Sequence, residues 1–240
     1  GLVGGYLAET RSLRTTFAVA ALFPLLSCTM ALVFLHDRRA TRDAEALRRT
    51  WRAVLDATRS RTVWLIAAFI FLFNFSPSFG PAFLYYQTDT LKFSQQFIGV
   101  LAAVQSVGYV IGALVYAPLS RRVSLARIVV VAVAVASITT FGYLLYRGPV
   151  SAVIIDFTFG IIAMMTQLVL LDLAAKSCPP RVEGTFFALL MSIYNAGQQG
   201  SQVVGGYLYD WLGFTPLVFI SATATALVLI MVPWLRVSEI

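Results

Sequence analysis

Long apolar runs separated by short polar links dominate this chain. The runs occupy residues 16–35, 63–86, 96–119, 128–146, 149–175, 184–207 and 214–235, and residues 1–8 have the composition of the end of another. About 20 apolar residues in a helix cross the hydrocarbon core of a bilayer. We therefore expect an all-α membrane protein with about six to seven transmembrane helices.

Composition agrees with this pattern. The chain is 59% hydrophobic and only 12% charged, whereas a soluble domain is about half apolar and a quarter charged. The net charge of +7 raises the question of a nucleic-acid partner, but the arginines lie mainly in the links, so we expect none. The two cysteines and the lone histidine indicate neither a disulfide framework nor a metal site, and we expect no cofactor.

Two of the runs carry side chains that a lipid-facing helix lacks. They are Asp156, Gln167 and Asp172 in 149–175, and Asn195, Gln198, Gln199 and Gln202 in 184–207. In a helix, Asp156 and Gln167 share one face with Gly160 and Ala163, and the four amides share a face of their own. Intramembrane carboxylates usually face a bundle interior or a wet cavity. We expect both faces to meet at a polar cleft, with hydrogen bonding between packed helices as the alternative.

The remaining runs differ in their polar content. Residues 63–86 carry Asn74 together with Pro77 and Pro81, which should break that helix. Residues 96–119 carry Gln105, and Gly108 with Gly112 predicts close helix packing. The runs 16–35, 128–146 and 214–235 lack Asp, Glu, Asn, Gln, Lys and Arg. We expect these three helices at the periphery of the bundle.

The longest polar stretch, 36–62, contains eight arginines and four acidic residues. Its apolar residues recur at helical spacing, which predicts an amphipathic helix on a membrane surface. Basic residues concentrate in cytoplasmic links. Placing 36–62 in the cytoplasm puts Arg121, Arg122 and Lys176 on the same side, and that is the orientation we predict.

A short repeat indicates a larger architecture. Residues 3–7, Val-Gly-Gly-Tyr-Leu, recur at 204–208. Parallel duplication of a six-helix unit builds the major facilitator architecture. On that alignment, 1–35 is the end of span 5 and span 6, 36–62 is the central cytoplasmic loop, and 63–240 is the C-terminal six-helix bundle. An N-terminal half would then precede this sequence.

Four runs resemble the folate–biopterin transporter family, a branch of the major facilitator superfamily. They are residues 83–88 (FLYYQT), 91–99 (LKFSQQFIG), 172–180 (DLAAKSCPP) and 183–192 (EGTFFALLMS). The resemblance implies secondary transport of folates, pterins or related solutes, coupled to an ion gradient, for which we expect protons. The partners would be this solute, the coupling ion, the lipid bilayer and the missing half.

Asp156 is the first candidate for a proton-binding or substrate-binding group, because a carboxylate can take a proton or accept the paired N–H donors of a pterin ring. We expect the pathway to include Asn74, Gln105, Gln167 and the amides Asn195, Gln198, Gln199 and Gln202. Tyr85 and Tyr86 could stack on a flat ring, or they could form an interfacial belt.

Asp172 lies near the cytoplasmic end of its run. We expect it to form a gate by pairing with Lys176, Arg121 or Arg122, and the alternative is a helix-end charge that reaches the lipid headgroups. No cation lies in the middle of a run, so a strongly anionic substrate would need one from the missing half.

A major facilitator exporter of drug-like or sugar compounds and a non-transporting membrane scaffold both fit the same fold. An enzyme does not, because the sequence has no nucleophile–base set, metal cluster or phosphate-binding loop.

Overall fold

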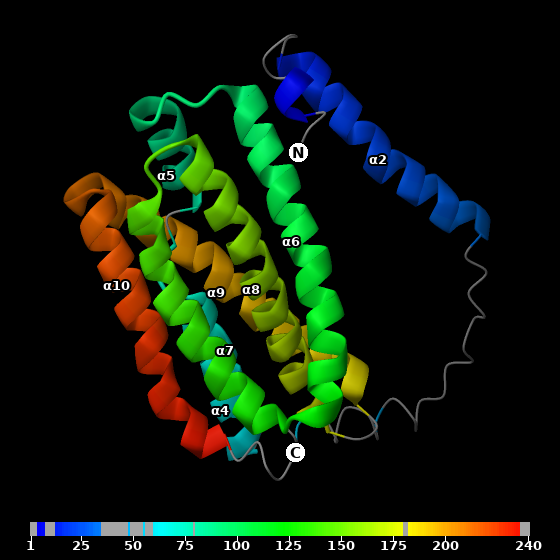
Figure 1. The fold of residues 1–240 in the computed structure, drawn as a ribbon. Coiled ribbons are helices and arrows are strands. Elements are labelled where there is room, and N and C mark those ends of the chain that lie inside the picture. The colour runs from blue at the N-terminus through cyan, green and yellow to red at the C-terminus, as the bar shows by residue number, and fades with distance from the viewer. Residues whose placement is uncertain are drawn as a thin grey trace.

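The computed structural model describes residues 4–7, 13–34, 48, 55, 60–78, 80–179 and 182–235, and this part of the chain is a bundle of helices (Figure 1). Almost all of the predicted surface helix in 36–62 lies outside the described residues. The elements run in the order α2 (Leu13–Phe34), α4 (Arg61–Asn74), α5 (Gly80–Tyr85), η1 (Tyr86–Thr90), α6 (Gln95–Arg122), α7 (Leu125–Thr140), η2 (Phe141–Leu145), α8 (Pro149–Lys176), α9 (Glu183–Leu212), α10 (Phe214–Leu227) and η3 (Val228–Leu235).

Five helical segments in the described part are long and apolar enough to cross a membrane. They are Arg14–Phe34, Gln95–Arg122, Leu125–Leu145, Pro149–Lys176 and Phe214–Leu235. The 30-residue α9 is also long enough, but its amide side chains interrupt its apolar sequence. The predicted all-α membrane fold is confirmed, and it is consistent with part of a major facilitator-type bundle.

The predicted break in the run 63–86 is present. Helix α4 ends at Asn74, and α5 begins at Gly80. A broken helix exposes backbone groups that need partners inside a membrane. Here the Ser78 N–H donates to the Ser201 carbonyl oxygen of α9 at 3.2 Å. The side-chain hydroxyl of Ser76 also ties the break to α10, because it donates to the Ser221 carbonyl oxygen at 2.9 Å.

Helices α6 and α8 pack along glycines on both sides, as the Gly108 and Gly112 spacing predicts. A Cβ atom at Gly108 would overlap the carbonyl oxygen of Phe157, and one at Gly112 would overlap that of Ile161. In the other direction, a Cβ atom at Gly160 would overlap the carbonyl oxygen of Gln105. The two backbones are therefore in direct contact, with no room for a side chain.

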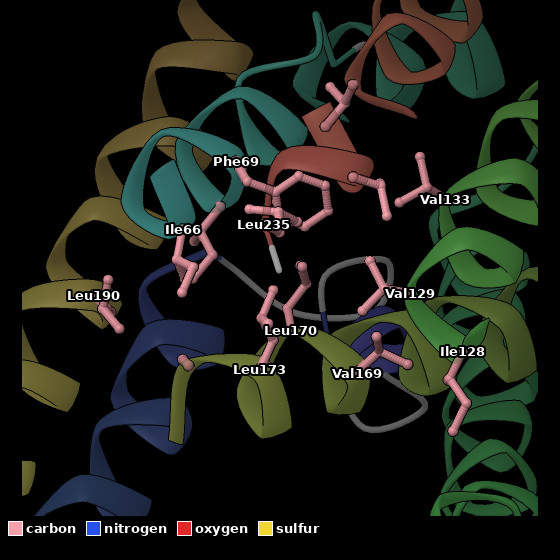
Figure 2. Packing of buried hydrophobic residues seen from close by; sticks show 14 of the residues in the cluster. Ile66, Phe69, Ile128, Val129, Val133, Val169, Leu170, Leu173, Leu190 and Leu235 are labelled. Carbon is pink, nitrogen blue, oxygen red and sulfur yellow. The ribbon is translucent and has the colours of Figure 1, made fainter. Parts of the chain in front are cut away.

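Two apolar clusters lie at opposite ends of the bundle. Figure 2 shows the larger one, in which side chains from α4, α7, α8, α9 and η3 meet; it includes Phe69, Val129, Leu173, Leu190 and Leu235. The smaller cluster consists of Leu101, Tyr146, Ala152 and Ile155. Helix α8 contributes residues 152 and 155 to one cluster and residues 169, 170, 173 and 174 to the other. The middle of α8 therefore lies between two packed regions.

Helix α2 is unlike the others because its side chains are exposed along most of its length. It stands apart from the bundle in Figure 1. Its apolar side chains would contact lipid or protein segments other than this bundle.

Candidate functional site

A cavity of about 330 Å³ lies at the level of the middle of α8. Five helices and η2 surround it, with Asn74 from α4, Gln105 from α6, Thr139 from α7, Gln167 from α8 and Gln198 from α9. The other lining residues are Phe73, Tyr109, Ala136, Thr140, Tyr143, Phe159, Ile162, Ala163, Thr166, Leu170 and Tyr194. The lining combines amides and hydroxyls with five aromatic rings, and none of these side chains carries a formal charge.

The predicted pathway residues divide into two groups. Asn74, Gln105, Gln167 and Gln198 meet at the cavity, although they come from four different helices. Asn195 and Gln199 are exposed on α9, and Gln202 is half-buried near Gly80, so none of these three is part of the lining. Of the four amides on this face of α9, Gln198 is therefore the one that lines the cavity.

Asp156 is buried, with 6% of its surface exposed, and it is not among the lining residues. The Tyr146 hydroxyl donates a hydrogen bond of 2.8 Å to its Oδ2 atom. The side-chain amide of Gln87 donates in turn to the Tyr146 oxygen at 2.7 Å. Three buried polar groups from η1, from the link after η2 and from α8 thus form one hydrogen-bonded chain, which satisfies the buried carboxylate.

Aromatic rings surround this chain and connect it to the cavity. The ring of Phe83 packs edge-on against Tyr146 at 4.8 Å and against Tyr143 at 5.1 Å. Tyr143 lines the cavity and packs against Phe159 at 4.5 Å. We call these rings, Phe83, Tyr143, Tyr146 and Phe159, the aromatic shell; through it Asp156 is connected to the cavity wall.

Tyr85 and Tyr86, for which the sequence allows either stacking on a substrate ring or an interfacial belt, lie outside the cavity. Tyr86 stacks on Phe214 at 4.3 Å with nearly parallel planes, and its hydroxyl donates to the Tyr146 carbonyl oxygen at 3.3 Å. Tyr85 is 61% exposed. Neither lines the cavity, which takes its rings from Phe73, Tyr109, Tyr143, Phe159 and Tyr194 instead.

The prediction that span 128–146 stays at the periphery is wrong. Helix α7 and η2 supply Ala136, Thr139, Thr140 and Tyr143 to the cavity. A threonine hydroxyl can bond to the backbone of its own helix, as Thr140 does with the Ala136 carbonyl oxygen at 2.8 Å. Threonines are therefore tolerated on lipid-facing helices too, and their presence in a sequence does not indicate a cavity. The opposite face of α7, with Val131 and Ile138, remains exposed.

Helical spacing could have identified two of the residues that sequence reasoning missed. Tyr109 follows Gln105 by four residues, and Tyr194 precedes Gln198 by four. Residues at this spacing share a helix face, so each tyrosine lies beside an amide that the sequence does single out.

A second cavity of about 270 Å³ adjoins the first and shares Phe73, Ala136, Thr140 and Tyr143 with it. Its distinct feature is a hydroxyl cluster at the break between α4 and α5, where the Thr225 hydroxyl donates to the Ser76 oxygen at 2.8 Å. Through Ser221 and Thr225, the run 214–235 also reaches the interior, which again differs from the expected peripheral position.

Two of the four residues predicted to form a gate, Asp172 and Lys176, are in contact. The Lys176 ammonium lies 3.0 Å from Asp172 Oδ2, and the Tyr116 hydroxyl donates to the same oxygen at 3.2 Å. Arg121 and Arg122 are exposed in the last turn of α6, and neither pairs with Asp172 here.

Comparison with known proteins gives a family. The model of the BT1 family matches residues 1–237. The chain belongs to the BT1 family. This agrees with the resemblance carried by the runs around Tyr86 and Asp172.

The curated relatives of this BT1 chain are named as transporters. The chain is 34% identical over 235 residues to the folate-biopterin transporter of Synechocystis, covering 90% of this chain and 46% of that protein. It is 30% identical over 149 residues to the probable folate-biopterin transporter 4 of Arabidopsis thaliana, covering 58% and 30%. It is 22% identical over 212 residues to folate transporter 2 of Plasmodium falciparum, covering 80% and 44%. The chain spans less than half the length of these relatives.

Proposed function

We propose that this BT1 chain forms part of a secondary active transporter for folate- or pterin-like solutes, working by alternating access with proton coupling. The supporting observation is the uncharged cavity of amides and aromatic rings at the level of the middle of α8. A flat heteroaromatic ring with alternating donors and acceptors matches such a lining. The names of the relatives support the same class of solute.

The cavity residues would divide the task of binding. Gln105, Gln167 and Gln198 would pair with the donors and acceptors at the edge of the ring, because each amide offers both. Tyr109 and Phe159 would pack against its faces. Asn74 has less freedom, since its amide nitrogen already donates to the Ile70 carbonyl oxygen at 2.7 Å.

Asp156 would be the proton-binding group. It is the one carboxylate in the middle of a span of the described chain, and Tyr146 and Gln87 hold it in a single arrangement. Protonation would remove the charge to which Tyr146 donates and so weaken this chain of hydrogen bonds. That change would favour a second conformation, in which the aromatic shell opens toward the end of the bundle where Arg147 links η2 to α8.

At the other end, Asp172 with Lys176 would form the gate, and Arg121 or Arg122 would join it when the chain changes state. We further propose the major facilitator duplication, in which another six-helix half completes the pathway and Arg121, Arg122 and Lys176 face the cytoplasm.

Uptake of labelled biopterin and folate by the full-length transporter, with and without a proton uncoupler, tests this function. We expect Asp156→Asn to abolish uncoupler-sensitive uptake while the protein still inserts into the membrane. Thr158→Val is the matched control, because Thr158 is exposed on the same helix and lies outside the cavity. Normal coupled uptake by Asp156→Asn would remove Asp156 from the mechanism. Absence of uptake by the unmodified protein would favour a scaffold, and gradient-driven efflux would favour an exporter.

A further inference from the structure

A second concave feature lies on a different part of the bundle. A groove of about 280 Å³ runs between α6, α7 and α8, with Leu119, Val131, Val135, Ile162 and Met165 among the residues along it. Apart from Arg127 and Thr166, every residue that lines it has a hydrocarbon or thioether side chain. An open apolar groove in the membrane-spanning part of a protein will be filled by hydrocarbon.

Arg127 stands at one end of the groove. It lies in the first turn of α7 and is exposed, and within the part of the chain that the structure describes its guanidinium has no hydrogen bond or ion pair. The groove follows α7 from residue 127 to residue 135, which is about 12 Å of helix rise. A cation at the end of a hydrocarbon-lined channel of this length matches an amphipathic ligand with an anionic head.

The surrounding charges favour an anion at this end. Arg121 and Arg122, in the last turn of α6, are exposed and precede Arg127 by six and five residues. The acid of α8 at this end, Asp172, pairs with Lys176 and accepts from Tyr116, and it makes no ion pair with Arg127. The local balance of unpaired charge among the described residues is therefore positive.

We infer that this groove is a binding site for an anionic phospholipid, with an acyl chain between α6 and α7 and the phosphate on Arg127. A guanidinium binds phosphate oxygens in pairs. Basic pockets between membrane helices recognise anionic headgroups in this way. The site lies apart from the transport cavity, except that Ile162 and Thr166 of α8 line both. A bound chain would therefore contact the same turn of α8 that forms one wall of the cavity.

Thermal unfolding of the purified full-length transporter in detergent tests the site. Phosphatidylglycerol and phosphatidylcholine with identical acyl chains are compared as additives. We expect phosphatidylglycerol to raise the unfolding midpoint more, and Arg127→Ala to weaken its apparent binding about tenfold, as loss of a charge-assisted pair does. Ala132→Leu, which fills the groove, should remove the difference between the two lipids while the protein stays folded.

Arg147→Ala is the matched control, since Arg147 is an exposed arginine between α7 and α8 at the opposite end of the bundle. It should leave the preference for phosphatidylglycerol intact. Equal stabilisation by both lipids would overturn the inference in favour of a purely apolar groove. Equal stabilisation by soluble glycerol phosphate would overturn it in favour of a site for the phosphate alone. An unchanged preference in Arg127→Ala would place the anionic site elsewhere.

Discussion

At the residue scale, Tyr146 links several buried side chains, although the sequence does not single it out. Tyr146 is fully buried, accepts from Gln87, donates to Asp156 and packs against Phe83. A lone tyrosine at the end of an apolar run looks like an interfacial residue. Only the fold places it beside Asp156, because the turn at Arg147 and Gly148 brings residue 146 back against the second turn of α8.

Replacing Tyr146 by phenylalanine tests this connection. The ring would stay in the aromatic shell, but Asp156 and Gln87 would each lose a buried partner. We expect a loss of about 1–3 kcal/mol in the free energy of unfolding, together with a shift in the pH dependence of uptake. Tyr85→Phe, at an exposed site near the same end, is the control for both measurements. Stability equal to that of the control would mean that the hydrogen-bonded chain contributes nothing.

Cys178, in the link after α8, gives a prediction about pH. Burial and, second, the charge of Glu183 raise the pKa of its thiol. The thiolate is the reactive form, so at a given pH less of it is present than in a free cysteine. We expect the rate of maleimide labelling at Cys178, followed on the proteolytic peptide that contains it, to rise at a higher pH than the rate for free cysteine. Glu183→Gln should move the curve back toward lower pH. A curve centred at or below that of free cysteine would contradict the assignment.

At the element scale, the sequence predicts close helix packing at Gly108 and Gly112, and the structure shows that the partner helix is α8. Glycines four residues apart, Gly108 and Gly112, face Phe157 and Ile161 of the partner helix backbone to backbone. The break after α4 is equally predictable, because Pro77 and Pro81 remove backbone donors. The buried faces of α7 and α10 are harder to predict. Their serine and threonine hydroxyls donate to backbone carbonyl oxygens, so these residues do not mark a polar face in the sequence.

Gly112→Ala should separate α6 from α8, because the new methyl group would overlap the Ile161 carbonyl group. Overpacking of this kind costs about 1–3 kcal/mol, and we expect a lower unfolding midpoint in detergent. Gly206→Ala is the control, because a Cβ atom at Gly206 would meet open space. We expect it to raise the stability of the helix by up to about 1 kcal/mol, since alanine has the higher helix propensity. A similar effect of both variants would show that the contact between the two backbones does not limit stability.

At the scale of the whole molecule, the two apolar clusters leave the cavity between them. Four of the amides that the sequence singles out line this cavity, because a polar group in a membrane span is costly and therefore informative. The sequence predicts neither the tyrosines nor the threonines, which are common in membrane helices for other reasons. It also places Asp156 in the cleft itself, whereas in the fold Asp156 is buried beside Tyr146 and is not one of the lining residues.

Filling the cavity should stop transport without unfolding the bundle. Ala163 lines the cavity and is exposed to it, so we expect Ala163→Trp to abolish uptake of biopterin while membrane insertion and the unfolding midpoint stay near normal. Ala188→Trp, at an exposed position on α9 outside the cavity, is the control. Uptake that survives Ala163→Trp would show that the solute follows another route.

The unwound segment 75–78 has a mechanical consequence. Gly197 and Gly205 of α9 lie so close to residues 71–78 that an added Cβ atom would collide with the Phe71 and Ser78 backbones. The Ser78 N–H is also tied to the Ser201 oxygen. Residues 75–78 and this face of α9 are therefore joined backbone to backbone, and we expect α9 to follow any displacement of this segment.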